Sequence, residues 1–190
     1  MNQKAINQAT DRLKKATAAG DRLISARSYQ DFESAWSDFL LAASGVYSKL
    51  EQGSKGHGPS EAWFGRRKHE RKGDPLLSYL HHARNADEHG IEPISKFDEG
   101  SWAIGGGGHY QLDAKTDLKV THISGPPPTL TIQPSRVTLV RIKDTRFGDY
   151  FDPPTEHLKI PLDDQSPVAV ARLALKYLDS MISDAATLCV

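Results

Sequence analysis

Residues 74–90 read DPLLSYLHHARNADEHG, and this stretch carries the clearest fold signal in the chain. Asp74 is a capping carboxylate, and Pro75 suits the first position of a helix. Gly90 is typical of the position that follows the end of a helix. The pattern therefore predicts a helix from about Pro75 to His89. The buried face of this helix is expected to carry three leucines at helical spacing: Leu76, Leu77 and Leu80.

The segments before this helix also follow helical periodicity. Apolar residues near the start of the chain keep helical spacing, and we expect Gly20 to break or kink that first helix. Ser28 is the expected N-cap of a long second helix, whose apolar stripe ends in a turn-rich linker at residues 51–60. Ser60 is expected to cap a short third helix. The first half of the chain is thus predicted to be helical.

The hydrophobic periodicity of the sequence changes after residue 93. Residues 95–163 alternate β-like runs with glycine and proline clusters, and they predict two or three hairpins in a small antiparallel sheet. Residues 166–188 return to helical spacing. We expect an α+β protein that forms a single domain over residues 1–190. Its four- to five-helix bundle would comprise residues 1–93 and 166–188, with the sheet inserted before the last helix.

Composition narrows the class of protein. The 190 residues include 24 Lys and Arg against 24 Asp and Glu, so no global charge attracts the chain to nucleic acid or to a membrane. The single cysteine, Cys189, excludes an intramolecular disulfide and a thiolate-rich metal site. The first residues lack the apolar core of a secretory signal, and no stretch approaches the roughly 18 apolar residues of a membrane span. We expect a cytoplasmic protein without a membrane segment.

The second half of the helix at residues 75–89 is unusually polar. On a helical wheel His81, Asn85 and His89 lie within about 80° of one another, and Arg84 flanks this face. Glu88 follows Arg84 by one turn and is placed to pair with it. These polar residues lie on the same helix face as the buried Leu77, so we expect them to be partly desolvated. They therefore need polar partners, from this chain or from a second copy.

Arg84-Asn85-x-x-x-His89 resembles the Arg-x(4–6)-His signature of the HEPN superfamily. These helical-bundle proteins carry the motif late in the bundle, often with Asn directly after the Arg. The resemblance covers the organisation of residues 1–91 and 166–188, and at the level of the motif only these three residues. It implies metal-independent RNA cleavage without a cofactor, at a site assembled across a homodimer. It further implies a role in defence or toxin–antitoxin systems, with a protein antitoxin or regulator as a partner.

The residue types suit that chemistry. RNA carries its own nucleophile, the 2′-hydroxyl, so no metal is needed if one group moves a proton and another neutralises the phosphorane. His89 suits proton transfer because imidazole titrates near neutral pH. Arg84 suits the second task, because its planar fork matches two phosphate oxygens and can contribute on the order of 3 kcal/mol. Asn85 would orient the histidine or hold the phosphate.

Two other polar clusters are candidates for a functional role beside the motif. Residues 66–72, RRKHERK, are either a phosphate-binding patch for RNA or a solvated helix face. His81 and His82 point about 100° apart on a helix, so at most one joins His89, and no metal site is predicted. His81 is instead expected to support the site or an interface, as is Glu88. The cations of the possible RNA patch are Arg66, Arg67, Lys68, Arg71 and Lys72.

Three interpretations of the motif stay open. The first is the endoribonuclease, and the second is a non-catalytic HEPN-like dimer that binds a protein or nucleic acid through its sheet. The third is an unrelated α+β protein, in which Arg84 and Glu88 form an ordinary surface pair at a polar helix end. The strand-rich insertion departs from the minimal family pattern. So does Ile91, where some family toxins have a tyrosine that is modified to control them.

Overall fold

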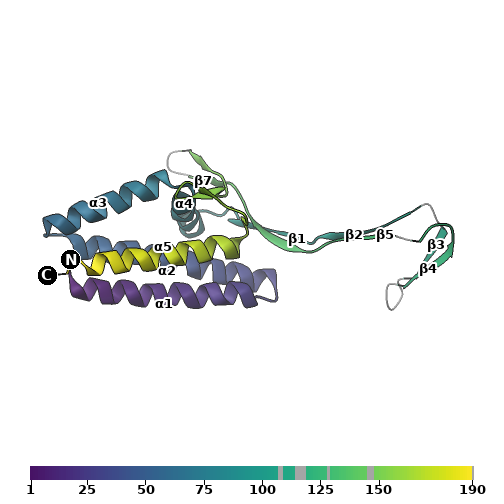
Figure 1. The fold of residues 1–190 in the computed structure, drawn as a ribbon, viewed down its shortest axis with the longest axis horizontal. Coiled ribbons are helices and arrows are strands. Elements are labelled where there is room, and N and C mark those ends of the chain that lie inside the picture. The colour runs from purple at the N-terminus through teal and green to yellow at the C-terminus, as the bar shows by residue number, and fades with distance from the viewer. Residues whose placement is uncertain (107–108, 114–118, 128, 145–147, 190) are drawn as a thin grey trace. The chain divides into compact units, whose positions relative to one another are not determined.

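The computed structural model describes residues 1–106, 109–113, 119–127, 129–144 and 148–189. Within these residues the protein is α+β, with a helix at its C-terminal end, as expected (Figure 1). None of the helices in this part of the chain combines the length and hydropathy of a membrane-spanning segment. The described residues form five helices: α1 (Gln3–Ser25), α2 (Tyr29–Ser54), α3 (Gly58–Gly73), α4 (Pro75–His89) and α5 (Pro167–Ala186).

Helix α4 has the predicted bounds, and its ends show why. The Asp74 carboxylate accepts a hydrogen bond from the Leu77 N–H at 2.8 Å, and Pro75 occupies the first turn. At the other end the Gly90 N–H donates to the Ala86 carbonyl at 2.7 Å. A Cβ at position 90 would lie 2.6 Å from that carbonyl oxygen, so close approach of the backbone favours glycine there.

Helix α1 is continuous, so the expected break at Gly20 is wrong. Gly20 is buried inside the helix, and a Cβ built on it would lie 3.3 Å from a Leu175 methyl group of α5. The glycine therefore allows close packing between two helices. Local helix propensity alone suggested a break, because it contains no information about the neighbouring helix.

The boundary between α2 and α3 also differs from the expectation. The Ser28 hydroxyl caps α2 as predicted, but α2 continues to Ser54 and takes up the start of the expected linker. Helix α3 begins at Gly58, so Ser60 lies inside it and is not its cap. The Ser60 hydroxyl lies 2.7 Å from His57 Nδ1. Its partner is thus the ring of the residue before the helix.

The hydrophobic core lies among the helices. Figure 1 shows α5, in yellow, alongside α1 and α2, and α5 also contacts α4. Trp36 and Phe39 of α2 stack at the centre, with ring centroids 5.4 Å apart and no exposed surface. From α5, Val170 and Met181 are almost fully buried in the same apolar cluster. The last helix therefore closes the bundle that the sequence predicted.

The strands pair two by two, where the sequence predicted hairpins within one sheet. The pairs are β1 with β6, β2 with β5, β3 with β4, β7 with β8, and β9 with β10. The last four pairs are antiparallel. The strands are β1 (Ser95–Asp98), β2 (Ser101–Gly105), β3 (His109–Asp113), β4 (Lys119–Ser124), β5 (Thr129–Gln133), β6 (Arg136–Leu139), β7 (Ile142–Lys143), β8 (Tyr150–Phe151), β9 (Glu156–His157) and β10 (Ile160–Pro161).

The chain divides into two compact units. The main unit comprises residues 1–96 and 137–190, and the hairpin unit comprises residues 97–136. The described residues of the hydrophobic core all belong to the main unit. In the hairpin unit, Trp102 of β2 lies opposite Ile132 of β5. Both are more than half exposed, at 52% and 65%, so this two-stranded ribbon presents an apolar face.

Candidate functional site

The last two turns of α4 bring the motif residues together around one carboxylate. Arg84 Nη1 donates to Asn85 Oδ1 at 3.2 Å, and Arg84 Nη2 lies 2.7 Å from Glu88 Oε2. His89 Nε2 lies 3.6 Å from the same Glu88 oxygen. A guanidinium and an imidazole thus meet at one end of a helix, with Glu88 as their shared partner. The Arg84–Glu88 pair has the i,i+4 spacing expected on one helix face, whereas the other two contacts join adjacent residues.

Exposure differs along this cluster. The Arg84 side chain is 27% exposed, and its Nε is buried without a hydrogen-bond partner among the described residues. The His89 side chain is 70% exposed. The stem of the arginine is therefore held by the protein, and the imidazole faces solvent. A reaction at this site would need a second surface to exclude water.

The two adjacent histidines of α4 have separate environments. His81 lines a cavity of about 30 Å³ inside the bundle, and burial, with a smaller contribution from the Arg71 charge, lowers the pKa of His81 to about 4. His82 stacks on the Phe151 ring at 3.5 Å, and its Nδ1 lies 3.3 Å from an Asp144 carboxylate oxygen. Neither forms a hydrogen bond or ion pair with the motif residues. Among the described residues there is no cluster of three or more ligands able to hold a metal ion.

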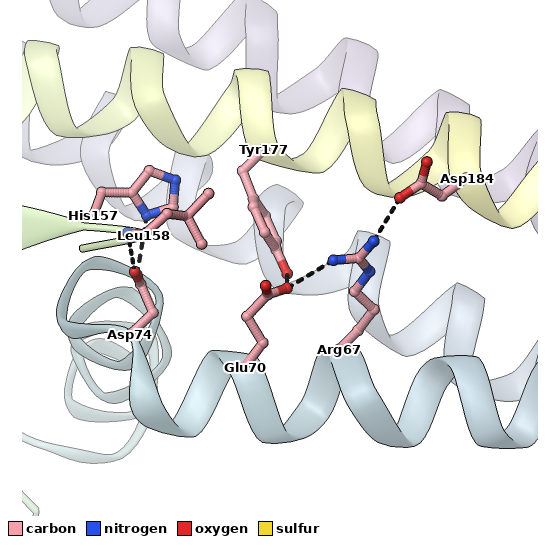
Figure 2. A network of polar contacts seen from close by, with 7 residues as sticks. All are labelled: Arg67, Glu70, Asp74, His157, Leu158, Tyr177 and Asp184. Carbon is pink, nitrogen blue, oxygen red and sulfur yellow. Dashed lines mark hydrogen bonds and ion pairs between the residues drawn. The ribbon is translucent and has the colours of Figure 1, made fainter. Parts of the chain in front are cut away.

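Arg67, one of the five α3 cations, belongs to a network that joins α3 to α5 (Figure 2). Its guanidinium lies 2.9 Å from Glu70 and 2.5 Å from Asp184. The Tyr177 hydroxyl donates to Glu70 at 2.6 Å. Burial acts to raise the pKa of Glu70, but the hydrogen bonds from Tyr177 and Arg67 outweigh it and lower this pKa. Arg67 therefore holds two helices together.

Of the other four cations of α3, two contact side chains of α2. Lys68 lies 3.6 Å from a carboxylate oxygen of α2, and the Arg71 guanidinium lies 4.6 Å from the centre of the Tyr47 ring. Arg66 and Lys72 form no ion pair with any described residue. Two of the five cations are therefore available without breaking an ion pair to a described residue. Both possible interpretations of this segment, RNA patch and solvated face, stay open.

A second polar cluster was not predicted from the sequence. Asp74, whose side chain is only 5% exposed, accepts hydrogen bonds from Leu77 N at 2.8 Å and Leu158 N at 2.6 Å, and its Oδ1 lies 3.0 Å from His157 Nδ1 (Figure 2). Burial acts to raise the pKa of Asp74, but these hydrogen bonds outweigh it and lower the pKa. The sequence indicated only the helix cap. Nothing local connects Asp74 with a histidine 83 residues further along the chain.

Comparison of the chain with protein-family models, with curated proteins and with solved structures finds no match. The HEPN relationship therefore stays a resemblance, carried by Arg84, Asn85 and His89 and by the order of the helices.

Proposed function

We propose that this chain is a metal-independent endoribonuclease whose site residues are Arg84, Asn85 and His89. The observation that carries the proposal is the shared contact of Arg84 Nη2 and His89 Nε2 with one Glu88 oxygen, at 2.7 and 3.6 Å. Phosphodiester cleavage through the 2′-hydroxyl needs a proton carrier beside a phosphate-binding cation. These two groups are such a pair.

The chemistry requires two proton transfers. The 2′-oxygen attacks the adjacent phosphorus as its proton passes to one imidazole, and the bond from phosphorus to the 5′-oxygen breaks. A second imidazole gives a proton to the leaving 5′-oxygen, and the product carries a 2′,3′-cyclic phosphate. Each chain contributes one exposed His89, so the proposal includes a two-fold homodimer in which a second copy supplies the other imidazole.

Glu88 acts in this proposal as a stand-in for the substrate phosphate. An ion pair four residues apart on a helix typically contributes only a few tenths of a kcal/mol, and both side chains of this pair are partly exposed, so a phosphate can displace Glu88 from Arg84 at small cost. Two phosphate oxygens then meet the guanidinium fork. Asn85, hydrogen-bonded to Arg84 Nη1 at 3.2 Å, holds the plane of the guanidinium.

The test is cleavage of end-labelled single-stranded RNA by the purified protein in EDTA. We expect His89→Ala and Arg84→Ala each to lower the rate by about 100-fold or more, because each removes one of the two functions. Arg27→Ala is the control, since Arg27 is exposed and lies outside both the motif and residues 66–72. Sedimentation analysis of the same samples should show a dimer.

Two results would contradict this function. One is cleavage that survives both motif substitutions, because the activity would then belong to another site or to a contaminant. The other is cleavage that EDTA abolishes, because the mechanism uses no metal. Normal cleavage by a protein that sediments as a monomer would contradict the shared dimer site, and only the role of the motif residues would stand.

A second candidate function is favoured by the hairpin unit. Trp102, Leu130 and Ile132 are 52%, 57% and 65% exposed on its ribbon, and exposed apolar patches mark interaction surfaces. A non-catalytic dimer that binds a protein or nucleic acid through this ribbon would show binding without cleavage. Binding to RNA would weaken steeply as salt is raised. Replacing Trp102 with Ser would weaken binding through the ribbon and leave cleavage through the motif unchanged.

A further inference from the structure

A cavity of about 620 Å³ lies between the β9–β10 hairpin and α5. Its volume is in the range of roughly 300–1,000 Å³ that is typical of small-molecule sites. It lies wholly within the main unit. Besides the rings of His157 and Tyr177, the wall contains aliphatic residues from both elements: Leu158, Ile160, Pro161, Leu162, Ala169 and Leu173.

The charged residues of the wall are divided between two segments. Helix α5 supplies two exposed cations one turn apart, Arg172 and Lys176, and neither forms an ion pair with a described residue. The loop before α5 supplies Asp163 and Asp164. Asp164 accepts hydrogen bonds from the Ser166 N–H at 2.7 Å and the Ser166 hydroxyl at 3.0 Å, so it is occupied as part of the helix start. The wall therefore carries its two cations on the α5 side and its two carboxylates on the loop side.

His157 adds a positioned polar group to the same cavity. Its Nδ1 lies 3.0 Å from Asp74 Oδ1, the oxygen that also accepts a hydrogen bond from the Leu77 N–H. Because an ionised carboxylate can only accept hydrogen bonds, the His157 Nδ1 is the donor and carries the proton. Nε2 forms no hydrogen bond with any described residue, and the side chain is 11% exposed. Figure 2 shows this second nitrogen on the side that faces α5. His157 is thus held by Asp74, and its ring forms part of the cavity wall.

The hairpin that forms one wall is held in an unfavourable conformation. Leu158 and Lys159 have φ angles of 50° and 67°, in the left-handed region that favours glycine or asparagine. Leu158 is nevertheless 45% exposed, and Ile160 is 69% exposed. Such strain costs about 1–3 kcal/mol per residue and is most often found at functional sites. Here it holds two aliphatic side chains at the mouth of a cavity.

We propose that this cavity binds a small organic anion with an aliphatic body. Its charged head would lie at Arg172 and Lys176, and its body against the aliphatic wall. An ammonium ligand would meet the two α5 cations, and a wholly polar ligand would leave the wall in water. The site is independent of the proposed nuclease, because it lies beside the N-terminal cap of α4, about 20 Å along the helix from His89.

Octanoate, kept below its micelle concentration, is a suitable probe for titration calorimetry. We expect saturable binding of one octanoate per chain, with at least tenfold weaker affinity in the double variant Arg172→Gln/Lys176→Gln. Lys4→Gln/Lys15→Gln is the matched control, because it removes the same charge from exposed positions on α1, and its affinity should equal the parent's. Both α5 cations are also exposed, so the first double variant should fold, which thermal melting monitored by circular dichroism checks.

The body of the ligand is tested separately. Ile160→Ser changes a 69% exposed side chain and should weaken octanoate binding, and octylammonium should not bind the parent protein. The proposal is overturned if the parent shows no saturable octanoate binding. It is equally overturned if both double variants lose affinity alike, because the attraction is then only the general charge of the surface. Binding of octylammonium as tight as that of octanoate would also exclude an anion site.

Discussion

The three histidines of α4 show how much a residue's surroundings decide its chemistry. His81 is directed into the bundle, His82 stacks on Phe151, and His89 is 70% exposed beside Glu88. All three lie within nine residues of one helix. Only His89 is open to a substrate, and this is why the proposed proton transfer is assigned to it.

His81 should make the stability of the protein depend on pH. Its pKa is lowered to about 4 in the folded protein, from an ordinary value of 6.5. As the pH falls from about 6.5 to about 4, the unfolded chain takes up a proton and the folded chain does not. The free energy of unfolding therefore decreases as the pH is lowered through this window. The slope stays below the limit of about 1.4 kcal/mol per pH unit, because the His81 ring keeps some contact with solvent.

The measurement is urea denaturation of the parent and of His81→Gln at several pH values between 7 and 4. The variant should have a shallower pH dependence, although its stability at pH 7 is expected to be lower because the substitution disturbs packing. His82→Gln is the comparison variant, since burial also lowers the pKa of His82 while the Asp144 carboxylate opposes that effect. Parallel curves for the parent and His81→Gln would show that His81 titrates normally in the folded state.

At the level of the elements, small residues set how closely the helices approach one another. Gly20 of α1 faces Leu175 of α5, and Gly53 of α2 faces Ala5 of α1. A Cβ at Gly53 would overlap the Ala5 Cβ and also lie 3.2 Å from Met1 Sδ. The contact between α1 and α2 therefore requires glycine at position 53 for steric reasons.

Two glycine substitutions should have opposite effects on stability. Gly53→Ala is expected to lower the free energy of unfolding by about 1–3 kcal/mol, as overpacking does. Gly65→Ala, in an exposed part of α3 with nothing within 4 Å of the added carbon, should raise it by about 0.5–1 kcal/mol through helix propensity. Chemical denaturation of the two variants beside the parent measures both changes. A stabilising Gly53→Ala would mean that α1 and α2 pack more loosely than described.

At the level of the whole molecule, the hydrophobic core and the hairpin unit consist of different residues. Among the described residues, the buried apolar cluster draws only on the main unit, up to Ile94 before residues 97–136 and from Leu139 after them. Strands β1 and β6 each cross a boundary between the two units in sequence, and these two strands pair with each other.

Removal of residues 99–134, with a two-residue turn joining Asp98 to Ser135, should leave the main unit folded. We expect its free energy of unfolding to change by less than about 1 kcal/mol, because no residue of the buried apolar cluster described above is removed and the closed loop becomes shorter. Urea denaturation followed by circular dichroism is the measurement. The full chain is the reference, and loss of cooperative unfolding in the shortened chain would show that the core depends on residues 99–134.

Local sequence determined the features that depend on neighbours along the chain. The bounds of α4 follow from Asp74, Pro75 and Gly90, and the cap of α2 follows from Ser28, because capping and backbone restriction act within one helical turn. The ion pair of Arg84 with Glu88 follows in the same way from the i,i+4 spacing of the helix. The α+β class and the closing helix follow from periodicity over longer segments.

Tertiary structure alone decided the rest, because it depends on contacts between residues far apart in the chain. Gly20 and Ser60 have the sequence signature of a break and a cap, but Leu175 packs against the first and α3 starts before the second. His157 meets Asp74 across 83 residues, and Arg67 meets Asp184 across 117. Burial and charge pairing of this kind set which groups are held and which stay available. They are not encoded in any local pattern, since they exist only once the chain has folded.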